Sequence, residues 1–275
     1  MWQALLLFVA CSAGCYTFCA VSPLEEPRSR RLIRAFVFVL SAAGAALILR
    51  FAWQQPAIAL GGLAALFIAG LLRWVSRRRT RRALVSGDVE AVLREWSSSM
   101  ARAPHAATMA PLMTATAFAA NGWIEQARAA LAAAQRGPAW DAALEHRLFL
   151  DALLLTFEGD RDEAMRQAER LARLPVPNAP APMRERIETL RGAVGALTRA
   201  FAHQSEQGDG DLLDRAASIS PLVHWAMRYA SAVVAIDEGD GEKARALLSG
   251  APEWPSESAF RTFHQEIAAH AGAQP

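Results

Sequence analysis

Three long runs of apolar residues open the chain, and each is long enough to cross a membrane as a helix. They extend over residues 2–21, 35–53 and 57–75, and only two arginines near span ends carry a charge within them. A helix rises 1.5 Å per residue, so about 20 residues cover the ~30 Å hydrocarbon core. Every backbone polar group in that core needs an internal partner, which only a helix provides to a single stretch. The pattern therefore predicts three transmembrane helices.

From residue 83 to the end, the pattern changes to amphipathic helices separated by turns. Ala, Leu, Arg and Glu dominate this part, and all four are strong helix formers, whereas the alternation typical of strands is missing. Turn signals recur at Gly87, Gly122, Gly159, 208–211 and 238–241. Gly can end one helix in the left-handed conformation and Asp can cap the next. We therefore expect an all-α protein, with helical hairpins following the three transmembrane helices.

The hairpins recur with a period. The glycines at 87, 122 and 159 are 35 and 37 residues apart, a spacing typical of repeats that contain two helices each. Three units share a small residue in the first helix, a Gly at the turn, an Ala five residues later and a Pro near the end. The residues that carry this pattern are Ala115, Phe118, Gly122, Ala127, Ala152, Gly159, Ala164, Ala232, Gly239 and Ala244. In these positions the chain resembles the tetratricopeptide repeat family.

The resemblance implies a tetratricopeptide-like α-solenoid over residues 83–275. The Pro-rich segment 175–182 would separate two halves of the array, and a last helix over 257–270 would cap it. Two units fit the pattern less well. The unit at 87–104 would take its first helix from the third membrane span, and the unit at 183–221 has an over-long first helix and a displaced turn.

Stacked hairpins of this family leave a concave groove, lined mainly by the first helices, which binds peptides or protein segments. The resemblance therefore implies a protein-binding groove. Its candidate residues are Met113, Thr116, His146, Phe149, Arg191, His224, Arg228 and Tyr229. The family's peptide-clamping Asn and basic residues have no clear match here, so a receptor for peptide termini is not supported.

Arginines set the expected orientation, because cytoplasmic loops carry an excess of basic residues. One basic loop follows the first span, and a basic juxtamembrane segment, 77–82, follows the third. This segment directly follows the transmembrane domain of residues 1–76, and we expect it to meet lipid headgroups. It contains Arg77, Arg78, Arg79, Arg81 and Arg82. The N-terminus is then outside and the helical domain is cytoplasmic. A strong bias to Arg and Ala suggests a bacterial protein, and hence a multi-pass protein of the inner membrane.

Two alternatives concern the first span. A signal peptide would need a basic residue in Met-Trp-Gln, which has none, although Cys15 faintly suggests a lipoprotein cleavage site. The three cysteines, Cys11, Cys15 and Cys19, lie on one helix face. They are either small residues at a helix interface, which we favour, or a thiol site.

Charge and motifs exclude several function classes. Residues 1–82 hold 11 Arg against 2 Glu, a net charge of +9, whereas residues 83–275 hold 18 Lys and Arg against 25 Asp and Glu, a net charge of −7. An acidic domain argues against nucleic acid as a partner. The chain has no phosphate-binding loop, no nucleophile elbow and no paired metal-ligand motif, so we expect neither an enzyme nor a cofactor, metal or small-molecule substrate.

Two functions remain. In the first, the protein is a membrane-anchored scaffold or adaptor whose repeats bind a protein partner on the cytoplasmic face. In the second, it is an accessory subunit of a membrane enzyme, transport or secretion complex, and the transmembrane helices make the functional contacts.

Overall fold

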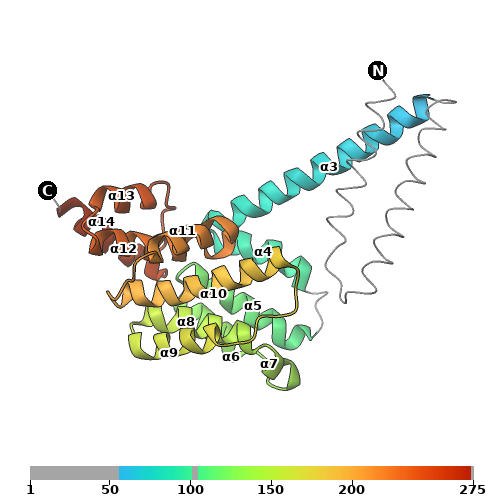
Figure 1. Cartoon of the computed structure of the whole chain (residues 1–275). Helices are drawn as coiled ribbons and strands as arrows, with labels where there is room; N and C mark the ends of the chain where they lie inside the picture. The colour runs from blue at the N-terminus through green and yellow to red at the C-terminus, as the bar shows by residue number, and fades with distance from the viewer. Residues whose placement is uncertain (1–55, 101–104, 274–275) are drawn as a thin grey trace. The chain divides into compact units, whose positions relative to one another are not determined.

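The computed structural model describes residues 56–100 and 105–273, and it is helical throughout these ranges (Figure 1). The side chains of residues 56–67, 69, 73, 77, 95–100 and 272–273 lie outside this description. Within the described ranges there is no strand, which confirms the all-α prediction. The predicted spans at 2–21 and 35–53, with the three cysteines, lie outside the described residues.

Twelve α-helices and one 3-10 helix make up the described chain. They are α3 (Pro56–Val85), α4 (Val89–Met100), α5 (Ala106–Ala120), α6 (Ile124–Ala132), α7 (Pro138–Ala142), α8 (Leu144–Glu158), α9 (Arg161–Ala172), α10 (Ala181–Phe201), α11 (Asp209–Ile219), η1 (Pro221–Val223), α12 (His224–Asp237), α13 (Gly241–Leu248) and α14 (Ala259–Ala273). Backbone contacts divide them between two units. The first includes residues up to 77 with 178–181, and the second includes 78–177 and 182–275, so α3 and α10 each begin in the first unit and continue in the second.

Helix α3 covers the predicted third span, 57–75, without a break. Several of its large apolar side chains are exposed: Ile68, Leu71, Leu72, Trp74 and Val75. Among the helices whose side chains the structure describes, none has the length and apolar character needed to cross a membrane.

The predicted hairpins are present in the second unit. Helix α5 pairs with α6, α8 with α9, and α12 with α13. The alanines expected at the helix contacts are buried, at most 1% exposed: Ala115, Ala127, Ala152, Ala164, Ala232 and Ala244. Phe118, the aromatic residue of this pattern, is half-buried against the core.

The turns of these hairpins form as the sequence predicts. Gly122, Gly159 and Gly239 have φ angles of 75°, 87° and 82°, a left-handed conformation that only Gly adopts without strain. Asp160 and Asp240 then cap α9 and α13, because each carboxylate accepts a hydrogen bond from a backbone N–H three residues later.

The hairpin of α10 and α11 departs from the others. Helix α10 has 21 residues, and its turn contains two left-handed residues, His203 at φ 55° and Gly208 at φ 93°. The sequence correctly predicts this over-long helix and displaced turn.

The first and last hairpins of the second unit meet. The indole N–H of Trp225 donates to the carbonyl of Val85 at 2.7 Å, at the end of α3. Gly87, in the next turn, lies so close to Pro252 and Trp254 that a Cβ there would come within 2.6 Å of the proline side chain. In an open solenoid each repeat contacts only its neighbours. The chain between α13 and α14 instead brings the last hairpin onto the first turn.

Helix α14 continues this closure. The Ser258 hydroxyl donates to the carbonyl of Asn121 at 2.8 Å, and the N–H of Ala259 donates to the carbonyl of Gly122 at the same distance. Phe260, which is fully buried, then packs against Phe157. The last helix was expected to cap the array, and α14 in addition contacts the turn between α5 and α6 and packs on α8.

Candidate functional site

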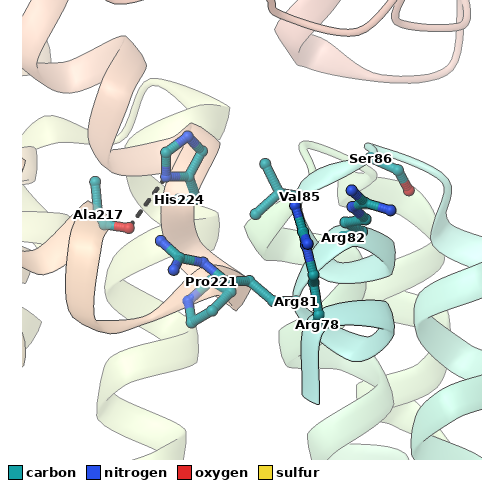
Figure 2. A pocket seen from close by; sticks show the side chains of 8 residues that line it. All are labelled: Arg78, Arg81, Arg82, Val85, Ser86, Ala217, Pro221 and His224. Atoms are coloured by element: carbon teal, nitrogen blue, oxygen red, sulfur yellow. Dashed lines mark hydrogen bonds between the residues drawn. The ribbon is translucent and has the colours of Figure 1, made fainter. Parts of the chain in front are cut away.

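Three arginines share one face near the end of α3. Arg81 and Arg82 follow Arg78 by three and four residues, spacings that place each of them on the same side of the helix as Arg78. All three line a pocket of about 390 Å³, which Figure 2 shows from close by. Arg79, from the same basic segment, is exposed and does not line the pocket.

A distant part of the chain supplies the facing wall. Ala217 of α11, Pro221 of η1 and His224 of α12 lie opposite the arginines, and their ribbons come from the C-terminal half of the chain (Figure 2). The bond from Trp225 to the carbonyl of Val85 holds this wall against α3. The carbonyl is one of the four that a helix leaves unsatisfied at its C-terminus, so Trp225 both caps α3 and fixes the pocket.

The pocket is strongly positive. Its lining contains three guanidinium groups and no carboxylate. Among the described residues, the side chains of Arg81 and Arg82 have no hydrogen bond and no ion pair. Like charges three and four residues apart repel one another, so this arrangement destabilises α3 slightly unless an anion is present. The C-terminal end of a helix favours cations, but that effect is small and does not explain the facing wall.

His224 carries its proton on a defined nitrogen. Its Nδ1 lies 3.0 Å from the carbonyl oxygen of Ala217, and a carbonyl can only accept, so Nδ1–H is the donor. Burial lowers the pKa of His224 below its ordinary value. The bond to Ala217 opposes that change, whereas the positive charges of Arg228 and Arg81 reinforce it. His224 is therefore neutral at neutral pH.

A second pocket, of about 330 Å³, lies where several first helices end. Phe157 of α8, Phe201 of α10 and Phe263 of α14 form its apolar centre, with ring centroids 5.2 to 5.9 Å apart. Ile236 of α12 and Ile267 of α14 complete the apolar lining. We call this site the aromatic pocket.

Ionisable side chains surround the aromatic pocket. Glu158, Arg161, His203, Glu266 and His270 line its rim, and all five are exposed. Asp237, which is outside the rim, lies 3.0 Å from Nδ1 of His203. An apolar centre with a polar rim is the usual arrangement of a surface that binds another protein.

The predicted groove residues do not gather at one site. Met113 and Phe149 are half-buried, and His146 is exposed, but none of the three lines either pocket. Arg228 is half-buried, 3.8 Å from Asp214. Of the predicted groove residues, His224 alone lines one of these two pockets, the basic one.

Three of the predicted groove residues belong to the interior, and that part of the prediction is wrong. Thr116 is buried, and its hydroxyl donates to the carbonyl of Leu112 within the same helix. Arg191 is 6% exposed and bonds to Glu145 and to two backbone carbonyls. Tyr229 is 0% exposed, so its side chain offers no surface to a partner.

Tyr229 lies in a hydrogen-bonded aromatic cluster. Its hydroxyl accepts from the indole N–H of Trp254 at 2.6 Å and shares a hydrogen bond with Nδ1 of His264 at 3.1 Å. Burial raises the pKa of Tyr229, so the phenol stays neutral at any physiological pH. Removing the Tyr229 side chain would destabilise the fold, and that loss of stability would obscure any effect on binding.

A sequence signal for the aromatic pocket exists. Phe157 and Phe201 each stand two residues before a left-handed turn residue, and Ile236 stands three residues before one. A recurring apolar side chain at the last turn of each first helix thus marks the surface where the hairpins end. The contribution of α14 has no such signal, because it depends on how the C-terminal segment folds back.

The basic segment was expected to meet lipid headgroups. The structure adds that Arg78, Arg81 and Arg82 line a pocket, that Arg79 does not, and that the side chain of Arg77 lies outside the description. Among the described residues, no group of three His, Cys, Asp or Glu side chains could hold a metal ion. Comparison with family models, curated proteins and solved structures gave no match to this chain.

Proposed function

We propose that the chain is a membrane-anchored helical-repeat adaptor that binds a protein partner on the cytoplasmic face of the membrane. The observation that carries the proposal is the aromatic pocket. Phe201, Phe263 and Ile236 are partly exposed apolar side chains from three helices that meet at one site. Binding energy at protein interfaces concentrates in such pockets, where one or two apolar anchor residues of the partner become buried.

Membrane anchoring is supported by the sequence and by α3. The three apolar stretches and the arginines that follow them favour a multi-pass anchor with the N-terminus outside. Helix α3 runs unbroken through the third stretch and exposes Leu72 and Trp74, of which 65% and 55% are accessible. Exposed large apolar side chains next to a basic segment suit a helix that lies among lipids and ends at the headgroups.

The tetratricopeptide-like character is part of the same proposal. Buried alanines at equivalent positions of three hairpins, with glycine turns after the first helices, support it. The contact between the first and last hairpins means that the partner site we propose is the aromatic pocket, at the turn ends, and not an open concave groove along the first helices.

A photo-cross-linking amino acid placed at His270 tests the proposal. His270 lies on the exposed rim of the aromatic pocket, and His146, which is also exposed but lines neither of the two pockets, is the matched position. In membranes of the source organism, the full-length protein should cross-link to a defined partner from position 270 and not from position 146. Equal cross-linking from both positions, or none from position 270, would contradict the proposal.

Two phenylalanine variants provide the control for stability. Phe263→Ala removes a half-buried ring from the pocket, and Phe149→Ala removes a half-buried ring elsewhere. Both should lower stability, but only Phe263→Ala should abolish the cross-link from position 270. Replacing the predicted spans with an unrelated anchor should leave the cross-link intact. If that replacement removes it, the partner contacts the transmembrane helices, and the accessory-subunit function gains support.

A further inference from the structure

We propose that the basic pocket at the end of α3 binds one phosphate group, presented by a phospholipid headgroup or by a small phosphorylated solute. The proposal is independent of the aromatic pocket and of its protein partner. It concerns the shared chemistry of the two ligands, a tetrahedral dianion or monoanion surrounded by guanidinium groups.

The donors suit phosphate in particular. Each guanidinium presents N–H groups in a planar fork that matches two oxygens of one phosphate, and such bonds are about twice as strong as neutral ones. Among the described residues, the guanidinium groups of Arg81 and Arg82 have no partner, and both line the pocket beside Arg78. A single carboxylate has two oxygens and could occupy only one fork well, whereas phosphate oxygens can serve several.

A hydrogen bond between distant parts of the chain holds the walls of the pocket together. Its two walls come from α3 and from the α11–α12 corner, more than 130 residues later in the chain, and the bond from Trp225 to Val85 joins them. Ser86 fixes the turn that follows α3, because its hydroxyl donates to Ala83 and accepts from the N–H of Asp88. A charge block that served only to set membrane topology would need no facing wall.

No carboxylate lines the pocket to compete with an external anion for the arginines. Two carboxylates on the elements around the pocket are engaged elsewhere. Asp214 of α11 accepts from Ser231 and lies 3.8 Å from Arg228, and Asp88 caps α4. The domain is acidic as a whole, yet none of its acidic side chains lines this site. The charges of Arg81 and Arg82 are therefore left for a ligand from outside the described residues.

Both sources of phosphate are within reach. If the third span ends near residue 75 as predicted, Arg78 and Arg82 follow about 5 and 10 Å further along the helix. The headgroup region extends roughly 5–7 Å beyond the hydrocarbon core on each side. The arginines thus follow the predicted span closely enough in the sequence for a headgroup to be one source of the phosphate, and a soluble phosphate is the other.

Two binding measurements on the full-length protein in an uncharged detergent test the proposal. Isothermal titration with inorganic phosphate measures binding of the soluble anion, and native mass spectrometry counts bound phosphatidylglycerol against phosphatidylcholine. The variant is R81Q/R82Q, and the control is R79Q, which removes a charge from the same segment but outside the pocket. Unfolding midpoints of all variants show that the fold is retained.

We expect saturable binding of one phosphate-bearing molecule per chain, weakened about tenfold or more by R81Q/R82Q because each lost charge-assisted bond is worth roughly that factor. R79Q should change the affinity less than twofold. Binding of inorganic phosphate identifies a soluble ligand, and selective retention of phosphatidylglycerol without phosphate binding identifies a headgroup. If neither probe binds, or if R79Q weakens binding as much as R81Q/R82Q, the site is only a diffuse basic surface and the proposal is wrong.

Discussion

Arginines in two regions of this molecule have opposite surroundings. On α10, Arg191 bonds to Glu145 at 2.9 Å, and Arg199 bonds to Asp209, so that each charge is neutralised inside the fold. At the end of α3, Arg81 and Arg82 face a pocket without a carboxylate. The guanidinium groups are thus paired with carboxylates of the same chain in one region and have no carboxylate beside them in the other. The difference separates residues that stabilise the fold from residues available to a ligand, and it can be tested.

The largest effect should come from Arg191. Arg191→Leu leaves Glu145 without its cation and the carbonyls of Leu174 and Pro175 without a donor. Breaking a buried pair of this kind costs about 3 kcal/mol, which corresponds to roughly 6–12 °C in the unfolding midpoint. Far-UV circular dichroism of the full-length protein during heating measures it. Arg184→Leu, at an exposed position of the same helix, is the control and should change little.

Asp209 should give the next largest effect, and its effect should depend on pH. Burial by itself would raise the pKa of this carboxyl, but the bonds from Arg199 and from the N–H of Glu206 outweigh burial and lower it. Asp209→Asn should therefore cost about 2 kcal/mol at neutral pH.

The direction of the pH dependence follows from the lowered pKa. The folded state binds its proton less readily than the unfolded state, so the stabilisation is present above about pH 4 and is lost as the pH falls through the folded pKa. The difference between the unfolding midpoints of the wild type and Asp209→Asn should shrink in acid. A difference that stays constant from pH 7 to pH 3 would mean that the carboxylate charge does not stabilise the fold.

Tyr229→Phe should have a smaller effect. The change keeps the buried ring but leaves the indole N–H of Trp254 without its acceptor, at a cost of about 1–2 kcal/mol. The unfolding midpoint should fall accordingly. Partner cross-linking from position 270 should be unchanged, because Tyr229 is buried. Loss of the cross-link without loss of stability would restore the original interpretation of Tyr229 as a binding residue.

The sequence predicts the local structure of this molecule better than its sites. Alanines such as Ala152 and glycines such as Gly159 determine the hairpins through contacts between residues that are close in the sequence. The pattern of small and turn residues along the chain therefore predicts the hairpins. The contact of Trp225 with Val85 joins residues 140 positions apart, and no local period encodes it. Tyr229 and Arg191 were placed on a groove because they stand on first helices. Which face of a helix is buried depends on this closure, so their burial could not be predicted from spacing.

The pockets illustrate the same limit. The arginines of α3 are contiguous in the sequence, so their charge was evident, whereas His224 joins them only through the fold. The aromatic pocket draws on α8, α10, α12 and α14, and its members are individually ordinary apolar residues. A charge cluster can be recognised from one segment of sequence, but a pocket made by several helix ends cannot.

The most direct test of the central claim is the unfolding midpoint of the full-length R81Q/R82Q variant beside that of Arg191→Leu, both measured without added anions. The account predicts that R81Q/R82Q unfolds at the wild-type temperature or slightly above it, because the repulsion of Arg78 by charges three and four residues later has been removed. Arg191→Leu should unfold well below it. A fall in R81Q/R82Q comparable to that of Arg191→Leu would show that the arginines of α3 are already paired within the protein, and the distinction between the two regions would be lost.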